Sequence, residues 1–179
     1  MTDAADAPHP TRVLLLGMMG SGKSSVGRAL AERTGWPFVD NDALVEHATG
    51  LTARELLRDR GEEAMREAEA AALRTGIGIP APAIVATAAG TIMRPEDREL
   101  IDGGGLVVWL RAPAEVLAAR AVGAEHRPWL DDDPVGWFTR TIAERAPLYR
   151  AVADLEIDTG SASPAAAAEQ VVEHLSAED

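Results

Sequence analysis

Short apolar runs alternate along the chain with longer stretches in which apolar residues recur at helical spacing. The apolar runs predict five β-strands: Val13–Leu16, Pro37–Val39, Ala83–Thr87, Leu106–Leu110 and Asp154–Ile157. Strands that are separated by helices form parallel sheets with both faces covered. The pattern therefore predicts a single α/β domain.

The helix-type stretches are marked by capping residues, glycines and proline. They are Lys23–Arg33, Asn41–His47, Thr52–Asp59, Glu62–Arg74, Pro95–Ile101, Pro113–Val122, Val135–Arg145 and Ser163–Leu175. Thr52 and Glu55 have the spacing of a capping box, and Gly61 separates the two helices around it. We expect residues 1–11 to form a flexible tail and residues 12–179 to form the domain, with a substrate-binding segment at about 41–75. The polar, turn-rich segment 122–134 predicts a mobile lid.

Composition and charge narrow the function. The chain has 179 residues and a mass of 18.9 kDa, which fits one domain with a sizeable core. Its net charge of −12 argues against an extended nucleic-acid surface, and the lack of cysteine excludes disulfides and thiolate chemistry. No apolar run approaches the ~20 residues that span a bilayer, and no secretory signal is recognisable at the start. We therefore expect a cytoplasmic protein that binds neither nucleic acid nor membrane.

The clearest motif follows the first strand and opens the first helix. Gly17, Gly20, Gly22, Lys23 and Ser24 match G-x-x-x-x-G-K-[ST] in that structural context. Glycines let backbone N–H groups converge on phosphate oxygens, and the helix N-terminus adds partial positive charge. Lysine reaches the terminal phosphates and the serine hydroxyl ligates Mg²⁺ in such loops. The motif predicts a site for the β- and γ-phosphates of a nucleoside triphosphate.

Two acidic residues follow the second strand. Asp40 and Asp42 form a D-x-D pair, and in an extended segment both side chains would point to the same side. One carboxylate would then face the metal and the other an acceptor hydroxyl. The alternative, equally compatible with the spacing, is that Asp40 or Asn41 caps the next helix.

Several arginines are candidates for binding phosphoryl or carboxylate groups. Arg66 lies at helical spacing from Glu62 and Glu69, which also fits an exposed helix with ordinary ion pairs. Arg120, Arg127 and Arg145 follow the fourth strand, and Arg127 lies in the predicted lid. Phosphoryl transfer needs cations around the in-line oxygens, although each arginine could equally be a solvated surface residue.

Taken together, these segments resemble the shikimate kinase family from about Arg12 to Leu175. GMMGSGKSSVGRALAERTG resembles the family's phosphate loop and first helix, and FVDNDALVEHATG its second strand and acidic segment. GEEAMREAE resembles the helix that carries its substrate arginine, HRPWL its lid, and RAPLYR the helix that follows. The resemblance implies a P-loop fold with a five-stranded parallel sheet in the order 2-3-1-4-5, flanked by helices.

The resemblance also implies a role for each matching residue. ATP and Mg²⁺ would be the cofactors, shikimate the small-molecule partner, and the protein a monomer in the shikimate pathway. The implied nucleotide residues are Gly20, Ser21, Gly22, Lys23, Ser24, Ser25, Arg120 and Arg127, with Ser24 and Asp40 at the metal. The implied acceptor residues are Asp42, Arg66, Ala88, Ala89, Gly90 and Arg145, and the implied catalytic residues are Lys23, Asp42 and Arg127.

One departure bears on the acceptor. Where the family has three consecutive glycines, this chain has Ala88, Ala89 and Gly90. If either alanine required a positive φ, it would cost about 1 kcal/mol, and the methyl groups would also narrow the pocket. The primary hypothesis is an ATP-dependent kinase of the shikimate 3-hydroxyl. The alternatives are a related kinase of another small polyol or cyclitol, and a nucleotide-binding module without phosphotransfer.

Overall fold

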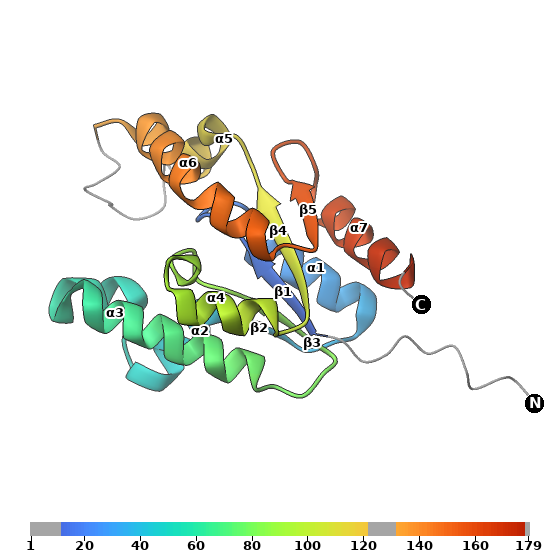
Figure 1. Cartoon of the computed structure of the whole chain (residues 1–179), viewed down its shortest axis with the longest axis horizontal. Helices are drawn as coiled ribbons and strands as arrows, with labels where there is room; N and C mark the ends of the chain where they lie inside the picture. The colour runs from blue at the N-terminus through green and yellow to red at the C-terminus, as the bar shows by residue number, and fades with distance from the viewer. Residues whose placement is uncertain (1–11, 122–131, 178–179) are drawn as a thin grey trace, which may run out of the picture.

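The computed structural model describes residues 12–121 and 132–177. These contain a parallel sheet in the order β2-β3-β1-β4-β5 (Figure 1). The strands are β1 (Arg12–Leu16), β2 (Phe38–Asp40), β3 (Ala83–Ala86), β4 (Leu106–Arg111) and β5 (Leu155–Asp158). The predicted fold class and strand order are both confirmed.

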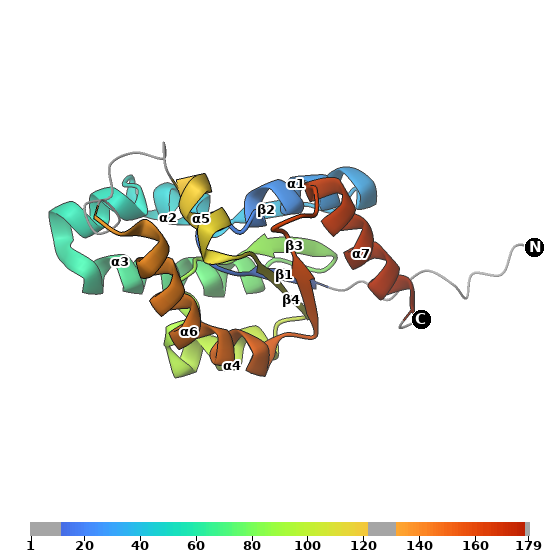
Figure 2. The same ribbon diagram turned by 90° about the horizontal axis from the view of Figure 1, so that it is seen from above.

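Helices cover both faces of this sheet. They are α1 (Lys23–Thr34), α2 (Asn41–Thr49), α3 (Ala53–Ile77), the short 3₁₀ helix η1 (Thr91–Met93), α4 (Pro95–Asp102), α5 (Ala114–Ala121), α6 (Pro134–Val152) and α7 (Pro164–Ala177). Figure 2 shows α1 and α7 on one side of the sheet, and α4 and α6 on the other.

Alternation along the strands builds one hydrophobic core on each face. Val13 and Leu15 of β1 pack with residues of α1 and α7, whereas Leu14 and Leu16 pack with residues of α3 to α6. All four side chains are fully buried. A strand that is buried on both faces reads as a continuous apolar run, which is why β1 was recognisable in the sequence.

The segment that projects from the sheet consists of α2 and α3. The capping box at Thr52 and Glu55 is present, and Gly61 interrupts α3 with a φ of 86° and a ψ of 173°. The predicted break at Gly61 is therefore confirmed. A separate apolar cluster, which includes Val45 and Leu56, joins α2 to α3.

Several predicted helix boundaries are wrong, among them the ends at His47 and Arg74, where the helices continue to Thr49 and Ile77. The helix expected to end at Arg145 continues to Val152, through Pro147. Proline removes one backbone hydrogen bond, but Tyr149, which is buried beyond it, stacks on Trp109 of β4 and holds the last turns in place. Pro113 precedes α5 and accepts its first hydrogen bond, so it does not lie in the first turn.

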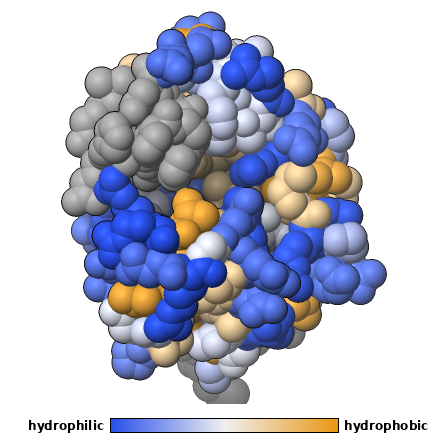
Figure 3. Space-filling model, turned by 90° about the vertical axis from the view of Figure 1, so that its left-hand side faces the viewer, coloured by the Kyte–Doolittle hydropathy of each residue, from blue (hydrophilic) through white to orange (hydrophobic). Residues whose placement is uncertain are grey.

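The exposed surface is mainly polar. Figure 3 shows the end of the molecule from which α3 projects, where hydrophilic side chains predominate and apolar ones form small separate groups. Among the described residues, the large apolar side chains that are exposed are Met93 and Val135. No helix in this described part of the chain is long and apolar enough to cross a membrane. The predicted tail, residues 1–11, and most of the predicted lid lie outside the described residues.

Candidate active site

The carboxyl ends of the strands open into a cavity of about 1400 Å³. Such edges are the usual ligand sites of open parallel sheets. The cavity is lined from separate elements by predicted site residues: Gly20, Gly22, Lys23, Ser24, Ser25, Asp40, Asp42, Arg66, Ala88, Ala89, Gly90, Arg120 and Arg145. The fold thus brings nearly all of the predicted site residues together.

The loop between β1 and α1 forms one end of the cavity. Gly17, Gly20 and Gly22 all have positive φ, and the Nζ of Lys23 donates to the carbonyl oxygens of Gly17 (2.9 Å) and Met18 (3.0 Å). Desolvation lowers the pKa of Lys23 to about 8, and the negative charges of Asp42 and Asp40 oppose that shift. The ammonium group therefore lies against the carbonyl oxygens of the loop, which the phosphate oxygens of a bound polyphosphate can replace.

The side chains of Ser24 and Asp40, both of which carry oxygen, are in contact beside this loop. The Ser24 hydroxyl donates to Asp40 Oδ2 at 2.5 Å, and Asp40 Oδ1 accepts a hydrogen bond from the backbone N–H of Asp42 at 3.1 Å. Asp40 therefore caps α2, as the alternative interpretation held, and Asp42 lies in the first turn of that helix rather than in an extended segment. The reason is that the Asp40 carboxylate satisfies an N–H group that the helix start leaves unpaired.

The Ser24 and Asp40 pair also fits a magnesium ion. Mg²⁺ prefers oxygen ligands and retains several waters, so it is commonly held by one or two protein groups and by substrate phosphates. Within the described residues there is no group of three or more histidine, aspartate and glutamate side chains that could hold a metal. A magnesium ion held by Ser24 and Asp40 would take its remaining ligands from water and from substrate phosphates.

The opposite end of the cavity carries arginine side chains together with a buried glutamate. Arg66 Nη1 contacts Glu69 Oε2 at 2.8 Å, and Nη2 contacts Glu62 Oε1 at 3.5 Å, so both predicted ion pairs are present. Glu69 is 7% exposed, and its burial raises its pKa, although Arg66 acts in the opposite direction. Arg66 is thus fixed by its neighbours with its guanidinium group facing the cavity.

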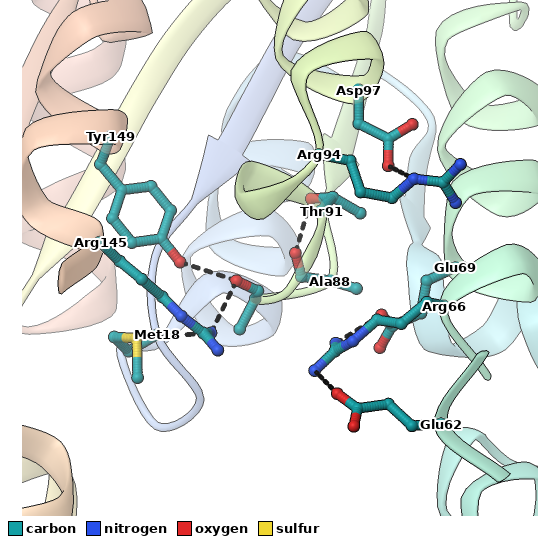
Figure 4. Close-up of polar contacts among 11 residues, drawn as sticks. Met18, Glu62, Arg66, Glu69, Ala88, Thr91, Arg94, Asp97, Arg145 and Tyr149 are labelled. Carbon is teal, nitrogen blue, oxygen red and sulfur yellow. Dashed lines mark hydrogen bonds and ion pairs between the residues drawn. The ribbon is translucent and has the colours of Figure 1, made fainter. Parts of the chain in front are cut away.

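A second guanidinium group faces Arg66 from α6. Arg145 Nη1 donates to the Ala89 carbonyl at 3.1 Å, and the Tyr149 hydroxyl donates to the same oxygen at 3.0 Å. Figure 4 shows Arg145 and Arg66 extending from opposite sides toward a common space. Two guanidinium groups that converge in this way can bind one carboxylate.

The segment between β3 and η1 separates these two arginines. No described residue other than glycine has a positive φ, so Ala88 and Ala89 carry no left-handed strain. Ala88 is 7% exposed, and both alanines line the cavity. The effect of the two methyl groups on the acceptor remains a prediction.

The three further predicted site residues are Ser21, Arg120 and Arg127. Ser21 is fully buried, and its backbone N–H donates to Met18 within the loop, so the structure does not bring its side chain to the cavity. Arg120 lines the cavity, and its guanidinium group donates to the carbonyl oxygens of Gly20 (3.0 Å) and Thr159 (2.7 Å). Arg127 lies outside the described residues.

Several residues at the cavity were not predicted from the sequence. Glu46, Arg54 and Thr159 line it, and the Tyr149 hydroxyl donates a hydrogen bond to Ala89, which also lines it. Thr159 is 138 residues from Ser21, whose carbonyl it contacts. No local motif signals such a contact, because it depends on how β5 lies in the sheet.

The fold and the cavity define a class, the P-loop kinases that transfer a phosphoryl group to a hydroxyl. The sequence profile described as "Shikimate kinase" matches residues 19–176, and the chain belongs to this family. The shikimate kinase of Halorhodospira halophila is 38% identical over 172 residues, which cover 93% of this chain and 94% of that protein. The shikimate kinase of Symbiobacterium thermophilum is 40% identical over 167 residues, covering 91% and 95%.

Solved structures agree with this assignment. The shikimate kinase from Acinetobacter baumannii in complex with shikimate is similar with a TM-score of 0.90 and 31% identity, covering 96% of each chain. A gluconokinase from Sinorhizobium meliloti is similar with a TM-score of 0.59 and 22% identity, covering 97% and 99%. The latter likeness shows the fold alone.

Proposed function

We propose that this protein transfers the γ-phosphoryl group of ATP to the 3-hydroxyl of shikimate, giving ADP and shikimate 3-phosphate. One observation carries the proposal: a phosphate-binding loop and a pair of converging guanidinium groups line the same cavity. The phosphate loop with Lys23 suits the polyphosphate of a nucleotide, and the two guanidinium groups suit a carboxylate. The relative from Acinetobacter baumannii, which has the same fold, is described in complex with shikimate.

The nucleotide would lie along the loop that precedes α1. Backbone N–H groups of Gly20 and Gly22, together with Lys23, would surround the β- and γ-phosphates. Ser25 at the start of α1 and Arg120 of α5 line the same end of the cavity. Ser24 and Asp40 would hold Mg²⁺, which when bound neutralises charge on the phosphate oxygens.

The acceptor would lie between α3 and α6. Arg66 and Arg145 would grip its carboxylate, and Asp42 would orient the hydroxyl near the phosphate end. The hydroxyl oxygen forms the new bond to γ-phosphorus while the bond to the ADP oxygen breaks, and the hydroxyl proton passes to Asp42. Arg127 of the predicted lid would stabilise the negative charge on the transferring group.

Acceptor-dependent ADP release from the purified protein tests this function. Shikimate should drive release, Lys23→Ala should abolish it, and Asp42→Asn should slow it while ATP binding stays nearly intact. Loss of nucleotide binding in Asp42→Asn would contradict an acceptor-side role. Release with another polyol but not with shikimate would favour the alternative kinase, for which the two alanines at positions 88 and 89 are the supporting observation. No release with any acceptor would favour a binding module.

We further propose that the enzyme acts in the cytoplasm as a monomer. The resemblance to the shikimate kinase family supports this proposal. The molecular mass in solution, measured by light scattering, should match 18.9 kDa. A dimeric mass at assay concentrations would contradict this proposal.

A further inference from the structure

Two backbone peptide groups at the cavity accept hydrogen bonds from buried hydroxyl groups. The Thr159 Oγ1 donates to the Ser21 carbonyl at 2.8 Å, the shorter of its two carbonyl contacts, since the Arg111 carbonyl lies 3.1 Å away. The Tyr149 Oη donates to the Ala89 carbonyl at 3.0 Å. Thr159 is 3% exposed and Tyr149 is 2% exposed. The residue that follows each carbonyl is a glycine that lines the cavity, Gly22 in one case and Gly90 in the other.

The geometry of the peptide bond links each carbonyl to the next N–H group. In a trans peptide the oxygen and the hydrogen point in opposite directions. Among the described residues the one cis bond is Ala81–Pro82, so both of these peptide groups are trans. Turning the Ser21 carbonyl toward Thr159 therefore turns the Gly22 N–H away from Thr159, and Tyr149 does the same to the Gly90 N–H. No backbone carbonyl of a described residue accepts a hydrogen bond from either N–H group.

The two hydroxyl groups are themselves fixed. The backbone of Thr159 donates to the Arg111 carbonyl at 2.8 Å and accepts from Arg120 at 2.7 Å. The ring of Tyr149 stacks on Trp109 with centroids 5.6 Å apart. Burial also raises the pKa of Tyr149 to about 12, so the phenol keeps its proton at neutral pH.

The two hydroxyl groups serve different halves of the cavity. Thr159 acts on the loop that carries Lys23, whereas Tyr149 acts on the segment between the two acceptor arginines and shares its carbonyl with Arg145. Figure 4 shows Tyr149 and Arg145 approaching that carbonyl from the same helix. The contacts of one hydroxyl involve no atom of the other half.

We propose that Thr159 and Tyr149 are positioning residues with separate roles, Thr159 orienting the Gly22 N–H for the nucleotide phosphates and Tyr149 orienting the Gly90 N–H and Arg145 for the acceptor carboxylate. The proposal rests on the proposed function for the identity of the acceptor. Its nucleotide half can be measured without any acceptor.

Two variants test the separation, and each is a control for the other because each loses one buried hydroxyl. Thr159→Val should raise the KM for ATP about tenfold, the loss of one hydrogen bond, and leave the KM for shikimate unchanged. Tyr149→Phe should raise the KM for shikimate about tenfold and leave the KM for ATP unchanged. Thr159→Ser keeps the hydroxyl and should restore the KM for ATP.

A third variant controls for the loss of a buried hydroxyl as such. Thr141 is 8% exposed and donates to Trp137 within α6, so Thr141→Val should change neither KM. Calorimetric titration of ADP and of shikimate, on protein whose folded state is verified by circular dichroism, repeats the comparison without turnover. Parallel changes in both affinities in either variant, or no change in both, would overturn the proposal. A wild-type protein that binds ADP but not shikimate would refute the proposed function and leave the Thr159 result standing.

Discussion

A single methyl group added at Gly90 should weaken acceptor binding and leave nucleotide binding unchanged. Gly90 has a φ of −86° and a ψ of −17°, which any residue can adopt. A Cβ placed there would lie 1.8 Å from Arg66 Nη1 and 3.3 Å from Glu69 Oε2. Gly90→Ala therefore perturbs Arg66 sterically, without straining the backbone.

The size of the effect follows from these distances. Ordinary contact begins at 3.4 Å, so the guanidinium nitrogen must retreat from 1.8 Å by about 1.6 Å, which breaks its geometry with Glu69. A hydrogen bond to a charged group contributes about 1.5–3 kcal/mol, so the KM for shikimate should rise about 10- to 100-fold. Stability should also fall, by about 1–3 kcal/mol, because buried Glu69 loses its hydrogen bond to Arg66.

The assay compares both substrates in Gly90→Ala and in a matched control. Gly103 has a φ of −89°, and a Cβ there would meet its nearest atom at 3.6 Å, so Gly103→Ala makes the same change without a clash. Gly103→Ala should leave both KM values unchanged, and Gly90→Ala should leave the KM for ATP unchanged. An unaltered KM for shikimate in Gly90→Ala would refute the role of Arg66 at its observed position.

Three other predictions concern the phosphate loop, a buried acid and the departure from the family pattern. Gly17→Ala should lower the free energy of unfolding by at least about 2 kcal/mol, because φ is +143° and a Cβ would lie 2.3 Å from a backbone oxygen of β4. Gly20→Ala, with φ of +79° and its nearest contact at 3.5 Å, should cost about 1 kcal/mol; equal losses in urea titrations would contradict this steric account. Asp97 is 1% exposed, and burial raises its pKa above the usual 3.8. The folded state therefore binds more protons, and stability should fall as pH rises through the interval between the usual and the raised pKa. Asp97→Asn should reduce that decline in unfolding measurements across pH and leave the part that buried Glu69 contributes; an undiminished decline would show that Asp97 does not cause it. Ala88→Gly combined with Ala89→Gly should lower the KM for shikimate, at a loss of stability of about 1 kcal/mol or more; an unchanged or higher KM would show that the methyl groups do not limit the site.

The sequence predicted best those features that depend on near neighbours. The phosphate loop could be predicted because its glycines, Lys23 and Ser24 lie close together in the sequence, between Gly17 and Ser24. The capping box at Thr52 and the break at Gly61 are equally local. The strand order came from the family resemblance, since alternation along a strand shows which faces are buried but not which strands pair.

Features that depend on packing between distant segments could not be predicted. Proline is a reliable signal of helix ends in isolation, yet α6 continues past Pro147 because Tyr149 is anchored on β4. The contact between Tyr149 and Ala89 spans 60 residues. The direction of Asp42 depended on whether Asp40 caps α2, and the spacing alone allowed both arrangements.

The two acceptor arginines are not equivalent, which explains how a chain of net charge −12 can offer a site to an anion. Arg66 already contacts two carboxylates, Glu62 and Glu69, so much of its charge is compensated. Arg145 makes no direct ion pair with a described residue, although its charge acts on Glu69 at longer range. It donates to the neutral Ala89 carbonyl and, at 4.0 Å, to the sulfur of Met18. Charges beyond about 8 Å are largely screened at physiological salt, so the distant acidic surface weakens this local field little. The positive charge available to an acceptor carboxylate therefore comes mainly from Arg145, while Arg66 contributes a preformed geometry that Glu69 holds in place.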